Sequence, residues 1–195
     1  MSKQRKLDFP LDLSKKLNVA HINICTEAEG PYRRMAIWFQ GCNIMCDGCC
    51  NPELQPIIPK HIMTVQEVLD IAILSKNENG IEGVTFLGGE PTLQEGVPLL
   101  ACALAQNELG TILFTGKKIE DLDESFITAM DLIIDGIFVK EQLDDERNLV
   151  GSRNQRIIYV TDRYIGEKQW FLSKREKKIE INFKDSLFIN GDVIF

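Results

Sequence analysis

Three cysteines in one short loop constrain this chain more than any other feature. Cys42, Cys46 and Cys49 follow the spacing Cys-x3-Cys-x2-Cys. Thiolates are preferred ligands of iron–sulfur clusters, and a compact loop can wrap several of them around one cluster. A fully ligated cubane takes four thiolates, whereas this spacing supplies three. One iron would therefore stay open for chemistry, much as a catalytic zinc keeps a vacant position.

The cysteine loop directly follows an apolar run at residues 35–39, which is typical of a strand buried on both faces. Strands alternate with helices along the rest of the chain, and this alternation predicts a parallel sheet with right-handed crossovers. About five such units are too few for a closed barrel of eight. We therefore expect an α/β fold, a partial (open) βα barrel with a mostly parallel sheet. The further strands are expected at 83–87, 111–114, 132–134 and 156–160, and the helices at 64–75, 97–107 and 125–130.

Three segments are expected along the chain: a polar lead-in at 1–17, the partial-barrel domain at 18–165 and a β-rich extension at 166–195. Within the domain, residues 21–24 alternate and suggest an edge strand or the run into the barrel. Within the extension, apolar and polar residues alternate over 179–184, and Asn190-Gly191 predicts a tight turn between 187–189 and 193–195. We expect this hairpin to pack on the same domain.

Charge and composition exclude several functions. The 195 residues carry a formal net charge of -7, which argues against a nucleic-acid partner because phosphate binding depends on Lys and Arg. No apolar run approaches the ~18 residues of a membrane span, and the first residues lack the apolar core of a signal peptide. We expect a cytoplasmic protein, in which six cysteines favour metal or redox use over disulfides. Cys25 and Cys102 are expected to be buried small hydrophobes.

A second motif, Gly-Gly-Glu-Pro at residues 88–91, follows the strand expected at 83–87. Both motifs thus stand at carboxyl ends of strands, where α/β folds place their active sites. Together and in this order they resemble the radical S-adenosylmethionine (SAM) superfamily. Further stretches resemble the small activating enzymes of anaerobic (class III) ribonucleotide reductases, at 30–34, 48–51, 115–116, 135–139 and 151–155.

Three features depart from those activating enzymes. Cys50 replaces the aromatic residue that is usual after the third cysteine. Glu90 stands where the reductase activases often have Asp, although Gly-Gly-Glu-Pro is the commoner form in the superfamily. The tail from residue 166 has no counterpart in the compact activases.

The resemblance implies a radical SAM oxidoreductase with one 4Fe–4S cluster, in which the three loop cysteines are the metal ligands. SAM would chelate the fourth iron, and its reductive cleavage would give a 5′-deoxyadenosyl radical. Because the cofactor does the difficult chemistry, no catalytic side-chain acid or base is expected. Glycines allow close approach of the backbone, and a carboxylate can bind the methionyl ammonium. The expected SAM contacts are Gly48, Cys50, Gly88, Gly89, Glu90, Thr115 and Asp135.

The expected partner is a large glycyl-radical enzyme resembling an anaerobic ribonucleotide reductase, with an electron donor such as flavodoxin or ferredoxin. One alternative is a radical SAM enzyme that modifies another peptide or a small metabolite. An alternative from another class is an iron–sulfur binding or electron-transfer module. A zinc site with His61 as fourth ligand is a weaker alternative, because a zinc ribbon needs a second Cys-x2-Cys pair. A redox dithiol at 46–49 is another weaker alternative. Arg33 and Arg34 could simply be solvated, and a role for Arg34 is implied only by the resemblance of residues 30–34 to a Gly-Pro-x-x-Arg stretch.

Overall fold

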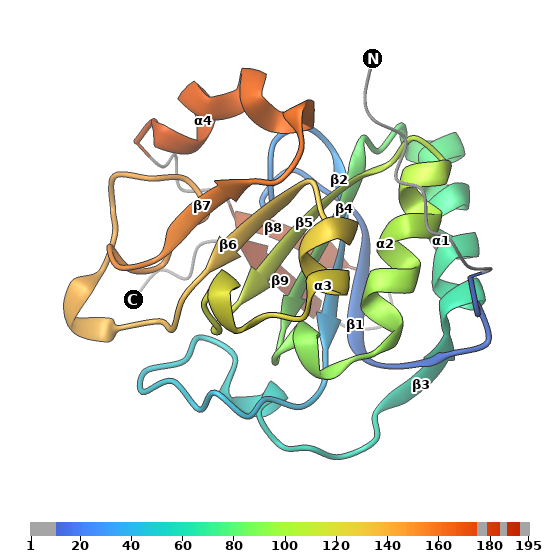
Figure 1. Cartoon of the computed structure of the whole chain (residues 1–195), viewed down its shortest axis with the longest axis horizontal. Coiled ribbons are helices and arrows are strands. Elements are labelled where there is room, and N and C mark those ends of the chain that lie inside the picture. The colour runs from blue at the N-terminus through green and yellow to red at the C-terminus, as the bar shows by residue number, and fades with distance from the viewer. Residues whose placement is uncertain (1–10, 175–178, 184–186, 192–195) are drawn as a thin grey trace.

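Seven strands form one open sheet in the order β3-β1-β2-β4-β5-β6-β7 (Figure 1). The computed structural model describes residues 11–174, 179–183 and 187–191. Its four central strands are parallel, namely β2 (Arg34–Phe39), β4 (Gly83–Gly88), β5 (Gly110–Thr115) and β6 (Leu132–Asp135). Antiparallel strands flank them, namely β1 (Lys16–Thr26), β3 (His61–Thr64) and β7 (Arg156–Tyr159). Within the described residues β3 and β7 do not pair with each other, so the predicted partial barrel is confirmed as open.

Helices α1 (Val65–Asn79), α2 (Gly96–Gln106) and α3 (Glu124–Ala129) cover one face of the sheet (Figure 1). Helix α1 begins at a capping box, in which the Thr64 side chain accepts from the Glu67 amide and Glu67 accepts from the Thr64 amide. It ends at Gly80, which adopts the left-handed conformation at φ 65. The short helix α4 (Lys168–Leu172) places Phe171 in a second core with Ile112 and Ile134 of the sheet.

Alternation along the strands supplies both faces of the sheet with apolar side chains. On β2, Met35, Ile37 and Phe39 join the core beneath the helices, whereas Ala36 and Trp38 join a separate cluster with Leu87. Residues 35–39 of β2 are all buried, as the apolar run predicted. The strand therefore fixes the start of the cysteine loop between two packed layers.

Three sequence-based expectations are wrong in detail. Residues 21–24 belong to β1, which lies between β3 and β2 and is not an edge strand. Strand β7 runs antiparallel to β6. Asn190 and Gly191 form no turn, because they pair with Glu180 and Ile179 in the hairpin of β8 (Ile179–Phe183) and β9 (Leu187–Gly191). Residues 1–10 of the lead-in and residues 193–195 of the proposed turn flank lie outside the described residues.

The hairpin is tied to the start of the domain through one carboxylate. Glu180 accepts hydrogen bonds from Thr26 Oγ1 at 2.5 Å and from the Glu27 amide at 2.7 Å.

Short 3₁₀ helices occupy the loops, namely η1 (Pro52–Leu54), η2 (Pro91–Leu93), η3 (Ile119–Asp121), η4 (Lys140–Gln142) and η5 (Asp162–Glu167). Over the described ranges, no helix has the length and apolar character needed to cross a membrane.

Candidate functional site

The cysteine loop and the Gly-Gly-Glu-Pro bend line one cavity of about 140 Å³ at the carboxyl ends of the parallel strands. Cys42, Cys46 and Cys49 all contribute to its wall, so the structure brings the three predicted ligands together. Cys50 lines the same cavity. The remaining two cysteines stay away from it. Cys102 is buried in the core, as predicted, whereas Cys25 is only partly buried and packs against that core.

Backbone amides approach all three sulfur atoms. Ile44 N–H donates to Cys42 Sγ and Asn51 N–H donates to Cys49 Sγ, each at 3.4 Å. The Phe138 backbone hydrogen-bonds to Cys46. Burial raises the pKa of the Cys46 thiol and the neighbouring thiols Cys49 and Cys42 raise it further, whereas this backbone contact lowers it. The amides are therefore placed to stabilise sulfur in its charged, metal-binding form.

The arrangement of the thiols fits a cluster better than a single ion. Among the described residues, no three His, Cys, Asp or Glu side chains converge closely enough to hold one metal ion. The three thiols instead face a common cavity from separate points of the loop. Three thiolates on one cavity can each bind a different iron of a cubane, whereas the closed tetrahedron of a structural zinc needs a fourth protein ligand.

Main-chain hydrogen bonds hold the beginning of the loop. Gly41 N–H donates to Leu54 O at 2.8 Å and Cys42 N–H donates to Gln55 O at 3.0 Å. From the neighbouring bend, Glu90 N–H donates to Gly41 O at 2.9 Å. The two chain segments approach so closely that a Cβ on Gly89 would lie 2.2 Å from Gly41 O. Glycine is thus required at position 89 by backbone packing.

Gly88 is also required by the backbone, for two reasons. Its φ of +108 lies in a region that side chains rarely adopt. A Cβ at this position would also lie 2.5 Å from the amide nitrogen of Phe39. Both glycines of the motif line the cavity, as predicted.

Glu90 lines the cavity, but its carboxylate is largely committed to the protein. It is 1% exposed. Its Oε1 accepts from Thr92 N–H, Thr92 Oγ1 and Thr115 Oγ1, and its Oε2 accepts from Gly116 N–H at 2.9 Å. Because a carboxylate has about four acceptor positions, two per oxygen, a ligand ammonium could be accepted only at Oε2. Glu90 therefore joins the bend after β4 to the end of β5 and keeps at most one position for a ligand.

Two predicted SAM contacts, Gly48 and Asp135, do not line the cavity. Asp135 is fully buried, and its carboxylate accepts from Arg156 Nε at 2.9 Å, from Arg156 Nη2 and from Ile119 N–H at 2.7 Å. Gly48 has a φ of +71 and faces the side chain of Lys140. The predicted Thr115, by contrast, does line the cavity.

The wall residues that were not singled out from the sequence include Gly116, Gly136, Phe138 and Gln155. All four fall in stretches that carried the resemblance. The Gln155 side chain donates to Gly136 O at 2.9 Å and accepts from the amides of Gly151 and Ser152. A Cβ on Gly116 would lie 2.8 Å from Ile44 of the cysteine loop. These residues shape the wall mainly through backbone packing, which has no distinctive residue pattern.

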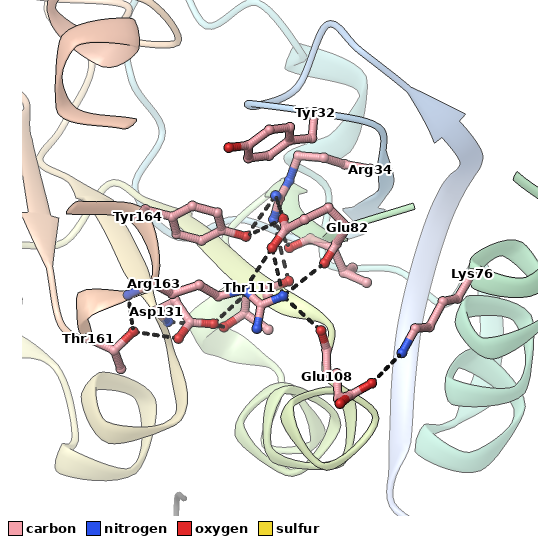
Figure 2. A network of polar contacts seen from close by, with 12 residues as sticks. Tyr32, Arg34, Lys76, Glu82, Glu108, Thr111, Asp131, Thr161, Arg163 and Tyr164 are labelled. Carbon is pink, nitrogen blue, oxygen red and sulfur yellow. Dashed lines mark hydrogen bonds and ion pairs between the residues drawn. The ribbon is translucent and has the colours of Figure 1, made fainter. Parts of the chain in front are cut away.

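A buried polar network lies at the amino ends of the same strands (Figure 2). Arg34 is fully buried; it pairs with Glu82 at 2.8 Å and donates to Tyr164 Oη at 2.8 Å and Thr85 Oγ1 at 2.8 Å. Arg163 also pairs with Glu82, at 2.7 Å. The reading of Arg34 as solvated is therefore wrong, whereas the Arg33 side chain is 59% exposed. Burial raises the pKa of the Tyr164 hydroxyl, which keeps this group protonated.

A family model described as "4Fe-4S single cluster domain" matches residues 28–158. The chain belongs to this family, and it is a radical SAM enzyme that binds a 4Fe–4S cluster.

Within that class the chain is similar to reductase-activating proteins. It is 31% identical over 153 residues to the anaerobic ribonucleoside-triphosphate reductase-activating protein of Enterobacteria phage T4, covering 75% of this chain and 96% of the relative. It is 27% identical over 156 residues to the pyruvate formate-lyase-activating enzyme of Streptococcus mutans, covering 73% and 59%. The solved structure of QueE from Escherichia coli aligns with a TM-score of 0.42 and 17% identity over 52% of each chain.

Proposed function

We propose that this chain generates a glycyl radical on a large partner similar to an anaerobic ribonucleoside-triphosphate reductase. The observation that carries the proposal is the single cavity shared by the three loop thiols and the Gly-Gly-Glu-Pro bend. The alignment with the phage T4 activating protein supports the choice of partner, because it extends over 96% of that relative.

In this proposal Cys42, Cys46 and Cys49 each bind one iron of the cluster. SAM would be held by the Gly88-Gly89 backbone, Thr115, Cys50 and the open position of Glu90 Oε2. A bound cluster would supply the electron for reductive cleavage of SAM, and that cleavage would provide the radical needed to remove a hydrogen atom from a glycine of the partner. The chain itself positions the groups and limits water; Phe114 and Phe138 supply apolar wall for this purpose.

The reductant is proposed to be a small electron carrier such as flavodoxin or ferredoxin, and the cytoplasm is the proposed compartment. Neither is needed for the first test, because a chemical reductant can replace the carrier. The proposal concerns the chemistry at the cavity, so it can be tested with the purified chain and one purified reductase.

The test has two stages under anoxic conditions. The reconstituted, reduced chain is first assayed for 5′-deoxyadenosine, and it is then mixed with an anaerobic ribonucleoside-triphosphate reductase and examined by electron paramagnetic resonance. We expect SAM cleavage in the first stage and a glycyl radical signal in the second. A Cys46→Ala variant should lose both, whereas Cys102→Ala, which alters a core thiol outside the cavity, should retain both. Intact SAM beside a complete, reduced cluster would refute the enzyme and favour an electron-transfer module.

A second candidate is a radical SAM enzyme acting on a nucleotide or another small metabolite. The chain is 32% identical over 124 residues to an S-adenosylmethionine-dependent nucleotide dehydratase of Lacinutrix mariniflava, although this covers only 25% of that protein. The hairpin of β8 and β9 also lies beyond the residues matched by the family model. SAM cleavage that is stimulated by nucleotides, without a glycyl radical on any reductase tested, would favour this candidate.

A further inference from the structure

The segment that follows β6, residues 136–140, crosses to the cysteine loop and contacts it at three places. The Phe138 backbone hydrogen-bonds to Cys46. The Lys140 ammonium pairs with Asp47 Oδ2 at 2.5 Å. The stem of Lys140 lies against Gly48, so that both polar and apolar parts of one side chain engage the loop.

The left-handed backbone of Gly48 favours glycine before the third cysteine, and the side of Gly48 that lacks a Cβ faces Lys140. Gly48 adopts a φ of +71, and a Cβ built on it would lie 3.3 Å from both Cβ and Cδ of Lys140. The side of Gly48 on which a Cβ would stand therefore faces the aliphatic stem of Lys140 and not the cavity. Because Gly48 and Asp47 separate Cys46 from Cys49, a side chain that holds them also holds the spacing between two of the thiols.

The apolar stem should matter more than the charge. The side chains of Lys140 and Asp47 are 49% and 82% exposed, and ion pairs at such exposure contribute little because water and salt screen them. Long lysine stems, in contrast, can cover neighbouring surface while the ammonium stays in water. The geometry thus separates the two parts of this side chain, and variants can test them independently.

We propose that Lys140 is a positioning residue of the cluster: its stem, packed over Gly48, holds the 46–49 segment in place so that the Phe138 amide reaches Cys46. The inference rests on the proposed role of Cys46 and Cys49 as cluster ligands. Lys140 itself would touch neither the cluster nor SAM. Its loss would act through the loop, as does the loss of groups that orient metal ligands in other sites.

The test uses the full chain with its cluster reconstituted under anoxia, in the variants Lys140→Ala and Lys140→Met. The measurement is the rate at which an iron chelator bleaches the cluster absorbance, together with the midpoint potential. We expect Lys140→Ala to lose the cluster about tenfold faster than the parent, since changes around metal ligands commonly weaken binding by 10- to 100-fold. Lys140→Met keeps an unbranched stem of similar length, so it should stay within about twofold of the parent.

Lys118→Ala is the matched control, because Lys118 is an exposed lysine at the start of η3, close in sequence to the wall residue Gly116. It should release iron at the parent rate. A parent-like rate in Lys140→Ala, or equally fast loss in Lys140→Met, would overturn the inference. Thermal unfolding of each cluster-free variant identifies any general loss of folding. A Cys46→Ala variant that keeps a complete cluster would instead refute the ligand assignment, so the two failures give different results.

Discussion

Replacement of Arg34 by Met should destabilise the fold by an amount that the structure lets us estimate. Arg34 is 0% exposed and pairs with Glu82, whose side chain is 26% exposed. Removing one partner of a buried ion pair costs about 3–5 kcal/mol. We expect the lower end, about 3 kcal/mol, because water reaches Glu82 and Arg163 continues to pair with it. For a chain of this length, the loss corresponds to a melting temperature lower by roughly 6–12 °C.

The assay is urea unfolding of the cluster-free chain, which separates folding from cofactor binding. The midpoint should fall while the slope of the transition stays unchanged, since the variant alters stability and not the surface exposed on unfolding. Arg33→Met is the control at the next position: its ion pair with Glu27 spans 3.6 Å, both side chains are more than half exposed, and the change should stay within about 0.5 kcal/mol. Equal stability of the two variants would refute the reasoning from burial.

Three further predictions concern single positions. Gly89→Ala should abolish stable cluster binding, measured as iron per chain, because the added Cβ would lie 2.2 Å from Gly41 O. The control Gly80→Ala has no atom within 4 Å of the added Cβ, so it should bind iron normally and lose about 1 kcal/mol in stability. Burial raises the pKa of Tyr164, so the contribution of its hydroxyl to the free energy of unfolding is intact below the unfolded pKa of about 10 and declines as the pH rises above it. Tyr164→Phe should therefore flatten the alkaline fall of the urea midpoint, and an unchanged fall contradicts this. Thr64→Ala should cost about 1 kcal/mol by removing the α1 cap, and an unchanged melting curve would contradict that role.

The sequence predicted the elements of the fold better than their directions. Apolar runs and helical periodicity located β2, β4, β5, β6 and the three covering helices. Buried positions recur along each of those segments and leave an apolar pattern in the sequence. Strand direction leaves no such pattern. Strand β7 was expected to be parallel, yet its antiparallel course places Arg156 opposite Asp135 and lets it take that carboxylate. This pairing of Asp135 within the protein was not indicated by the sequence pattern.

The site shows the same division between local and distant information. The cysteine spacing and the paired glycines are local, and both were placed correctly in the cavity. The burial of Arg34 depends on Glu82 and Tyr164, which lie 48 and 130 residues further along the chain. Only the resemblance at residues 30–34, and no local physical pattern, distinguishes Arg34 from the exposed Arg33. Only the assembled sheet determines which of the two arginines is enclosed.

The way the cysteine loop is suspended has a consequence for how such a chain can evolve. Peptide groups, not side chains, join Gly41 and Cys42 to Leu54 and Gln55, and Gly89 and Glu90 to Phe39 and Gly41. Every residue except proline carries the same donor and acceptor, so most substitutions leave this framework intact. Insertion or deletion of one residue between Phe39 and Gln55 would instead shift the whole set of bonds. Apart from the three ligand cysteines and the glycines required by the backbone, side chains here can therefore change while the number of residues in the loop stays fixed.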